Sequence, residues 1–453
     1  MKLFITLISV FTLINCSSHT ALKPQQNPFI LNNINIIDVA NRKVRLDKSI
    51  LISEGKIQKI APSPMRHIST DIKVIEGDGG YITPGLIDMH VHMYEQAALT
   101  LALSHGVTHV RIMNGVPNQL KWRDQVAAGE LIGSSATVSS PIISAYDSAY
   151  LHHTVHTADQ ATAAVKLYQS QGYDLIKAYG NLSEKALTAL IKASMIHNIP
   201  IAKHGPHASG NMPVSKLIGL QSFEHVEDIY QGPLNHKFAP NRLSTIAEDI
   251  KATNVPVTPT LNIYYQLTQL SNGKAQFLNS IPTEYTSDII AMETSHNQVK
   301  RWLNASKKMA EHNQKTLQFL QHITQVFHDA GITLLVGSDS GVLLSPHGLA
   351  THNEMQLMLK SGLSTFDVLA AATTNPAKAL KLDSHIGRIM ENYNADLILS
   401  KTNPLQDLSV LESPEAVVKN GVFYSKETLK ELKDNAIKSR SLWEEIITLL
   451  GAL

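Results

Sequence analysis

Histidine is the residue type that stands out in this sequence, with 21 histidines among 453 residues. Its imidazole ring binds metal ions and transfers protons near neutral pH. Two of these residues, His90 and His92, end an apolar run and are separated by a single valine. On a β-strand this spacing places both rings on the same face. The pair is therefore a candidate for two ligands of one metal ion.

Four further side chains with suitable chemistry follow other apolar runs, namely Lys177, His204, His225 and Asp339. Imidazole and carboxylate groups suit Zn²⁺ or a similar divalent ion. Each residue alone has an ordinary explanation. A single histidine at a strand end is more often structural, a lone lysine is usually solvated or salt-bridged, and Asp339 could be a turn residue. Their joint placement at the ends of predicted strands favours a metal centre.

The elements that must position these residues alternate between short apolar strands and longer helical stretches from Tyr81 onward. Thr157 and Gln160 have the spacing of a capping box, and Ser183 precedes another predicted helix. The eight predicted strands are 82–92, 107–113, 137–144, 175–179, 199–204, 222–225, 255–260 and 333–337. Eight such units predict an α/β fold, a (β/α)₈ TIM-type barrel whose chemistry lies at the strand ends. The long stretch between the last two strands predicts a mostly helical insertion that covers the site.

Short runs with period two lie on both sides of the barrel, which we place at 81–384. Segments 27–80 and 385–425 are predicted to form one small discontinuous β-sandwich domain. Its carboxyl-terminal part contains Asn420-Gly421, a strong hairpin turn. Residues 426–453 follow as an amphipathic terminal helix packed on the body of the protein.

The amino terminus has the pattern of a secretory signal, because Lys2 precedes an apolar run too short to span a ~30 Å hydrocarbon core. The run ends at Cys16, the only cysteine, so an internal disulfide is excluded. This arrangement resembles a bacterial lipoprotein signal, with 1–15 removed and 16–26 forming a lipidated terminus and linker. The alternative is an ordinary signal peptide. Since Ser17 carries no acidic retention signal, the resemblance implies an exported, periplasm-facing protein anchored in the outer membrane.

Composition narrows the classes of partner. Hydrophobic residues make up 43% and charged residues 17%, so a large core can be buried and global disorder is excluded. The formal net charge is +1 and no basic run occurs, which argues against nucleic acid and against a polybasic membrane surface. A small-molecule substrate is the expected partner, with membrane contact only through a lipid at Cys16. The oligomeric state stays open.

The segment 83–92, Thr-Pro-Gly-Leu-Ile-Asp-Met-His-Val-His, resembles the opening metal motif of the amidohydrolase superfamily. The rest of the chain is similar to its imidazolonepropionase-like branch, which includes metal-dependent dipeptidases of the prolidase type. The segments that carry this similarity are 174–179, 203–206, 222–225, 337–341, 346–348, 371–376, 387–388 and 395–397. The resemblance extends from residue 28 to residue 425 and is specific for the superfamily rather than for a substrate.

The resemblance implies a site with two divalent metal ions, expected to be Zn²⁺. One ion would be held by His90, His92, Lys177 and Asp339, and the other by Lys177, His204 and His225. Lys177 would be carboxylated and would bridge the two ions together with a hydroxide. Asp339 would act as the general base and acid. This site implies hydrolysis of an amide or peptide-like C–N bond in a small substrate.

Three further residues are candidates for contacts with the substrate. His347 could orient substrate or neighbouring side chains, Tyr230 could meet a substrate carboxylate, and His207 either contacts substrate or caps a loop. Two alternatives to a linear-amide hydrolase remain at this point. One is a cyclic-amide hydrolase or lactonase on the same scaffold, and the other is a non-catalytic periplasmic binding lipoprotein.

Overall fold

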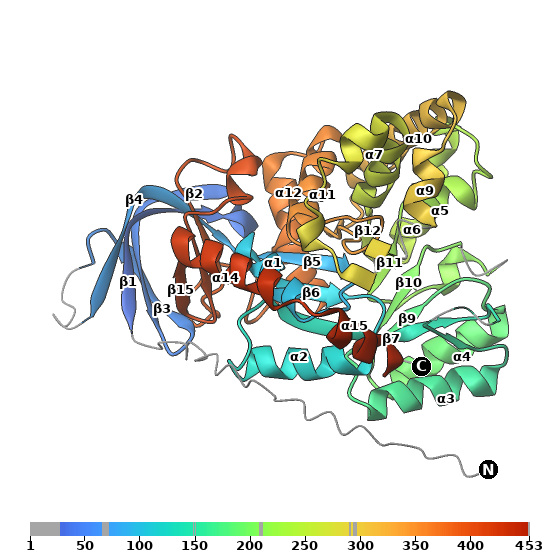
Figure 1. The fold of residues 1–453 in the computed structure, drawn as a ribbon, viewed down its shortest axis with the longest axis horizontal. Helices are drawn as coiled ribbons and strands as arrows, with labels where there is room; N and C mark the ends of the chain where they lie inside the picture. The colour runs from blue at the N-terminus through green and yellow to red at the C-terminus, as the bar shows by residue number, and fades with distance from the viewer. Residues whose placement is uncertain are drawn as a thin grey trace, which may run out of the picture.

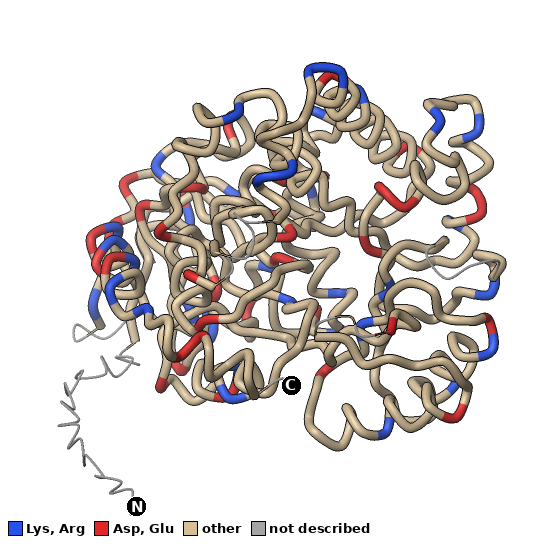
Figure 2. Tube along the Cα trace, turned by 45° about the vertical axis from the view of Figure 1, so that its right-hand side comes forward, with Lys and Arg blue, Asp and Glu red and all other residues tan. Residues whose placement is uncertain are grey.

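The computed structural model describes residues 28–65, 72–147, 149, 151–207, 212–289, 291–292 and 297–451. The predicted signal segment and Cys16 lie outside these residues. Within them, no helix is both long enough and apolar enough to cross a bilayer. Acidic and basic residues are interspersed along the described chain, as Figure 2 shows.

The centre of the molecule is the predicted parallel barrel. Its strands, in chain order, are β5 (Leu86–Val91), β6 (Val107–Ile112), β7 (Ser135–Ser144), β9 (Leu175–Ala178), β10 (Ile201–His204), β11 (Ser222–Glu224) and β12 (Val257–Thr258). Neighbours in this order are hydrogen-bonded, and a short strand β8 (His152–Thr154) pairs with β7. The predicted eighth strand, 333–337, forms an isolated bridge from Leu334 to Val257, and Ser340 just past it forms another to Val91. These two bridges join the ends of the sheet and complete the barrel.

Helices surround the barrel, and two of them, at 158–170 and 184–196, begin with the predicted caps. The side chain of Thr157 accepts a hydrogen bond from the backbone N–H of Gln160, and that of Ser183 accepts one from Ala186. The principal outer helices are α1 (Ala97–Ser104), α2 (Pro117–Ala127), α3 (Ala158–Ser170), α4 (Glu184–Ile196), α6 (Leu243–Ala252), α11 (Leu349–Lys360), α12 (Thr365–Ala372) and α13 (Thr374–Ala379). These caps satisfy backbone donors that a helix start otherwise leaves unpaired.

The long segment between β12 and the closing strand is helical, as predicted. It contains α7 (Leu261–Leu278), the 3-10 turn η4 (Thr283–Tyr285), α9 (Gln298–Leu303) and α10 (Lys307–Asp329). Figure 1 shows α7, α9 and α10 together above the strands β11 and β12.

The predicted small domain is a seven-stranded sheet built from both ends of the chain (Figure 1). Its order is β15 (Val422–Ser425), β14 (Ala416–Lys419), β13 (Leu397–Ser400), β4 (Lys73–Pro84), β1 (Phe29–Asp38), β2 (Lys43–Ser53) and β3 (Lys56–Pro62). Within this sheet β1 pairs with β4 in parallel and with β2 in an antiparallel arrangement. The Asn420-Gly421 turn joins β14 to β15, with φ of 48° and 76° as a primed hairpin turn requires.

The predicted strand 82–92 is divided between two sheets, which corrects the sequence expectation. Residues up to Pro84 belong to β4, whereas β5 begins at Leu86 in the barrel. Gly85 lies at the crossing, and a Cβ there would come within 2.2 Å of the Thr108 side chain. Only glycine permits the chain to pass this close to β6.

The terminal helix is also divided, into α14 (Lys426–Ser439) and α15 (Leu442–Leu450). The break falls at Arg440, whose ψ of 141° is extended. Its guanidinium Nε donates to a Glu95 carboxylate oxygen at 2.7 Å, and Nη1 donates to the Glu284 carbonyl oxygen at 2.8 Å. The break therefore places the Arg440 guanidinium between the loop after β5 and the helical insertion.

Candidate metal centre

The predicted ligands meet at the carboxyl end of the barrel. His90 lies within β5 and His92 directly follows it, and their ring centroids are 5.4 Å apart. The ring of His90 is 4.6 Å from that of His225, which in turn is 4.4 Å from that of His204. Four imidazoles from three strands thus form a continuous cluster.

Asp339 lies in the same cluster, just past the closing strand. One ligand atom from each of His90, His225 and Asp339 falls within 4.8 Å of the other two. The Asp339 Oδ1 atom is 3.0 Å from His92 Nε2 and 3.6 Å from His90 Nε2. The backbone of Asp339 has a φ of 54°. Its N–H donates to the His90 carbonyl oxygen at 2.7 Å, so this strained conformation is held by the neighbouring strand.

The electrostatics of the cluster suit a cation. Burial lowers the pKa of His90 to about 4 and that of His225 to about 3, so both rings are neutral near pH 7. Burial alone would raise the pKa of Asp339, but the adjacent histidines His90, His92 and His225 hold it well below its usual value. Neutral imidazoles beside an ionised carboxylate are the protonation states that metal coordination requires.

Lys177, in β9, is the sixth predicted ligand and lies fully buried. Its Nζ atom has no hydrogen-bond partner in the described part of the chain. Burial lowers the pKa of this amine to about 8. The nearby anions Glu224 and Asp339 favour its charged form and Arg111 opposes it. A buried amine without a partner costs free energy, which points to a ligand that accompanies it.

His204 gives the same indication. Its Nδ1 atom is buried and has no hydrogen-bond partner among the described residues, while its ring lies 4.0 Å from that of Tyr179. Two unpartnered nitrogen atoms beside an ionised carboxylate and neutral imidazoles fit a site for divalent cations. The residues present therefore agree with the metal centre expected from the sequence.

Glu224 and Arg111 were not predicted from the sequence, and they support the cluster through hydrogen bonds. Glu224 accepts a hydrogen bond from His90 Nδ1 at 2.8 Å and another from Arg111 Nη2 at 2.6 Å. The first bond places the proton of His90 on Nδ1 and leaves Nε2 free for a cation. Burial would raise the pKa of Glu224, but Arg111 and His90 hold it far below its usual value. The available signal was a carboxylate directly before His225 within a buried strand.

Asp88 was also missed. It accepts hydrogen bonds from the backbone N–H groups of Ser338 and His90, at 3.0 and 3.1 Å, and from the Thr351 hydroxyl at 2.6 Å. These bonds join β5 to the closing strand beside Asp339. The period of two that links His90 to His92 extends back to Asp88, and this pattern could have identified it.

The three weaker candidates have different surroundings. His347 is buried, and its Nδ1 lies 3.0 Å from the hydroxyl of Ser340, the residue after Asp339. The backbone N–H of His207 donates to an Asp228 carboxylate oxygen at 2.9 Å, and its Nδ1 lies 3.1 Å from the same oxygen. The Tyr230 ring stacks on Phe238 with centroids 5.4 Å apart. Contact of any of these three residues with a substrate stays a prediction.

The protein combines a closed parallel barrel with a small sheet at its side and a histidine-rich centre at the carboxyl ends of the strands. This combination is typical of a class of metal-dependent barrel proteins. The model of the amidohydrolase family matches residues 81–423, which is most of the chain. The protein therefore belongs to the amidohydrolase family, as the sequence motifs predicted.

Curated relatives are distant. An imidazolonepropionase from Thermoplasma volcanium is 20% identical over 359 residues, which are 78% of this chain and 83% of that protein. An adenine deaminase from Clostridium perfringens is 26% identical over 203 residues, covering 41% of this chain and 34% of the relative. An ochratoxinase from Aspergillus niger is 32% identical over 90 residues, covering 19% of this chain and 18% of the relative. The last two matches thus span only 34% and 18% of the relatives' length.

Solved structures confirm the fold across nearly the whole chain. A putative prolidase from Bifidobacterium longum has a TM-score of 0.70 at 22% identity, and the match covers 91% of this chain and 99% of the prolidase chain. The bottromycin amidohydrolase has a TM-score of 0.74 at 20% identity, with 92% of each chain covered. A Xaa-Pro dipeptidase with bound methionine has a TM-score of 0.67 at 18% identity, covering 88% of this chain and 100% of its own. At these identities the similarity establishes the fold alone.

Proposed function

We propose that this protein is a metal-dependent hydrolase that cleaves an amide or peptide-like C–N bond in a small substrate. The observation that carries the proposal is the buried Lys177 amine, which lacks a partner in the described chain and lies among neutral histidines and an ionised carboxylate. The names of its relatives and structural neighbours, which include an imidazolonepropionase, a prolidase and a Xaa-Pro dipeptidase, support this class of reaction.

The proposed ligand sets are those implied by the family motifs. His90, His92, Lys177 and Asp339 would hold one divalent ion, and Lys177, His204 and His225 a second, with Zn²⁺ as the expected metal. When bound, such ions lower the pKa of a shared water and polarise the scissile carbonyl group.

Lys177 can serve two ions only after a change in its chemistry. Its lowered pKa of about 8 leaves a usable fraction of neutral amine near neutral pH. The lone pair of that amine forms a new N–C bond to the carbon of CO₂, and the nitrogen loses one proton to water. The product is a carbamate, an anion with two oxygen atoms that can each reach one ion.

Side chains of the protein carry out the positioning and the proton transfer. Glu224 holds His90 in one tautomer, and the 3.0 Å approach of His92 Nε2 holds the Asp339 carboxylate in place. Asp339 takes the proton from the attacking water and delivers it to the nitrogen of the leaving amine. General acid–base catalysis of this kind contributes roughly 10²–10⁴-fold to the rate.

A substrate panel tests the proposal. The zinc-loaded protein is assayed against dipeptides including Xaa-Pro, N-acyl amino acids, cyclic amides and lactones. Hydrolysis of linear amides is expected, and Asp339→Asn should lower kcat by about 10²–10⁴-fold. The matched control Asp329→Asn changes an exposed aspartate at the end of α10 and should leave kcat unchanged. Hydrolysis of lactones or cyclic amides alone would favour the alternative reaction. Full metal content with no hydrolysis of any substrate would favour a binding protein.

A further inference from the structure

A cavity lies at the end of the barrel opposite the metal centre. Its wall includes residues that come just before barrel strands, among them Pro200 before β10, Gln221 before β11, Pro256 before β12 and Thr333 before the closing strand. Its volume is about 480 Å³. Sites for small molecules occupy roughly 300–1,000 Å³, so this cavity is large enough for a compact metabolite.

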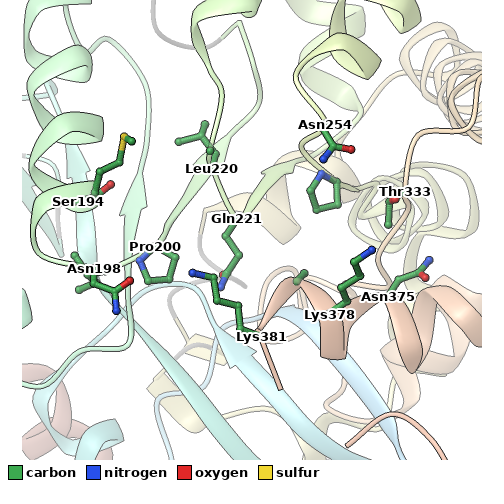
Figure 3. A pocket seen from close by; sticks show the side chains of 15 residues that line it. Ser194, Asn198, Pro200, Leu220, Gln221, Asn254, Thr333, Asn375, Lys378 and Lys381 are labelled. Atoms are coloured by element: carbon green, nitrogen blue, oxygen red, sulfur yellow. The ribbon is translucent and has the colours of Figure 1, made fainter. Parts of the chain in front are cut away.

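The lining of the cavity is positively charged. Lys378 and Lys381 are its charged residues, and neither an aspartate nor a glutamate lines it. Neither lysine belongs to an ion pair found among the described residues. Both are exposed, so their ammonium groups are free to turn into the cavity. Figure 3 shows both side chains rising from the same side of the cavity, with Gln221 between their amine ends in this view.

The floor of the cavity adds a hydrogen-bond donor of fixed orientation. Gln221 Oε1 accepts a hydrogen bond from Arg111 Nη1 at 2.8 Å. Because a guanidinium group can only donate, the oxygen of the amide must face Arg111. The Nε2 group of Gln221 therefore points away from Arg111, on the side where the residue lines the cavity. A half-buried amide N–H₂ and two ammonium groups in the wall of one cavity form a donor set for an anion.

The rest of the wall suits a short carbon skeleton and further polar contacts. The wall includes the apolar side chains of Met195, Ile199 and Leu220. It also includes the amides of Asn254 and Asn375, which Figure 3 shows across the cavity from Asn198. Asn375 Nδ2 donates to the Leu334 carbonyl oxygen at 3.1 Å, which anchors this amide to the closing strand. The cavity thus combines charge, donors and apolar surface within one compact space.

We propose that this cavity binds a small organic dianion, a dicarboxylate or a phosphate monoester, through Lys378, Lys381 and the amide of Gln221. The two lysines have no aspartate or glutamate beside them in the cavity wall, so together they match a ligand with two negative charges. The apolar part of the wall would contact the carbon chain of that ligand. The site lies at the opposite end of the barrel from the metal centre and does not depend on the proposed hydrolysis.

Equilibrium dialysis with succinate and with glycerol phosphate tests this proposal. The protein is first treated with a chelator, so that bound metal does not capture either probe. One equivalent of at least one probe should bind per chain, more weakly as salt concentration rises. The better probe identifies the carboxylate or the phosphate class. Absence of binding of both probes at concentrations up to about 10 mM would overturn the proposal.

Variants locate the binding. The double variant Lys378→Ala/Lys381→Ala should weaken binding by about tenfold or more, since two charge-assisted contacts are lost. The matched control Lys307→Ala/Lys308→Ala removes the same charge from the exposed start of α10 and should change the affinity less than about twofold. Gln221→Met keeps the length of the side chain, removes the donor and should weaken binding by a smaller factor. Equal losses in both double variants, or full binding in the first, would contradict the assignment.

Discussion

Two layers of the barrel interior each contain a fully buried cation, and the two cations differ in their hydrogen bonding. Arg111 donates to the Met89 carbonyl oxygen at 2.7 Å, to Gln221 and Ser222 at 2.8 Å each, and to Glu224 at 2.6 Å. Lys177, in the layer of the histidines, has no hydrogen-bond partner for its amine in the described chain.

The difference separates a structural charge from a functional one. A buried charge that is paired and hydrogen-bonded can be tolerated by the fold, whereas an unpaired one lowers the free energy of unfolding. Arginine also stays protonated at any ordinary pH, while burial brings the pKa of Lys177 down to about 8. The hydrogen bonds of Arg111 are therefore satisfied without a ligand, whereas the Lys177 amine needs a ligand to satisfy it.

The largest effect expected from this comparison is on activity. Lys177→Ala should lower kcat/KM by about 10⁴-fold, equivalent to about 5.5 kcal/mol, because the proposed bridge between two metal ions would be lost. Metal content measured by elemental analysis should fall from two ions per chain toward one or none. Lys177→Glu restores a carboxylate and should recover part of the metal content. Lys192→Ala, on the exposed face of α4, is the control. Full metal content and activity in Lys177→Ala would contradict the function proposed for the amine.

The next effect is on stability, and it should have opposite signs in the two layers. Arg111→Met should lower the free energy of unfolding by about 3–5 kcal/mol, because Glu224 would keep a buried charge without its partner. Lys177→Met should raise the stability of the metal-free protein by about 1–3 kcal/mol, because an unpaired buried amine is removed. Chemical denaturation of chelator-treated protein measures both changes.

A double variant sharpens this result. Arg111→Met/Glu224→Leu removes both charges and should recover much of the stability lost in Arg111→Met. It also removes the acceptor of the His90 Nδ1 proton, so metal affinity should stay about 10–100-fold below that of the unchanged protein. Destabilisation by Lys177→Met equal to that by Arg111→Met would show that the two cations are equivalent.

The last effect is a pH dependence of stability. The pKa of Lys177 is about 8 in the folded chain against an ordinary value of 10.5. Between these values the unfolded chain binds more protons, so folding stability rises with pH. In metal-free and CO₂-free buffer, stability relative to Lys177→Met should therefore be constant below pH 8 and then rise by up to about 1.4 kcal/mol per pH unit. A constant difference up to pH 10 would mean that burial does not shift this pKa.

The sequence predicted the barrel well because its signals are local. Apolar runs, capping residues and the Asn420-Gly421 turn depend on neighbours within a few positions, and the structure has these elements close to the expected places. The strand predicted at 82–92 is in fact two strands, because its halves pair with β13 and with β6, which lie far apart in the sequence. The predicted single terminal helix breaks at Arg440 for the same kind of reason, since the partners of that residue, Glu95 and Glu284, are more than 150 positions away.

The sequence identified the candidate ligands but not the residues that support them. The six candidate ligands have types and spacings that a reader of the sequence can recognise, and the structure brings them to one end of the barrel. Glu224 and Arg111 were not recognised, because a buried glutamate or arginine reveals its purpose only through its partner. The lipid anchor at Cys16 lies outside the described residues and stays a prediction, as do the substrate and the oligomeric state.

The sequence by itself determined the class of fold and the identity of the candidate ligands, because strand period, helix caps and the residue types that bind metals are properties of short segments. The tertiary structure decided which charges are paired. It joins Arg111 to Glu224 across 113 positions and leaves the Lys177 amine without a hydrogen-bond partner among the described residues. It also places two lysines and an amide in the wall of one cavity at the other end of the barrel. Pairing depends on distances between segments remote in the chain, and only the folded barrel sets those distances.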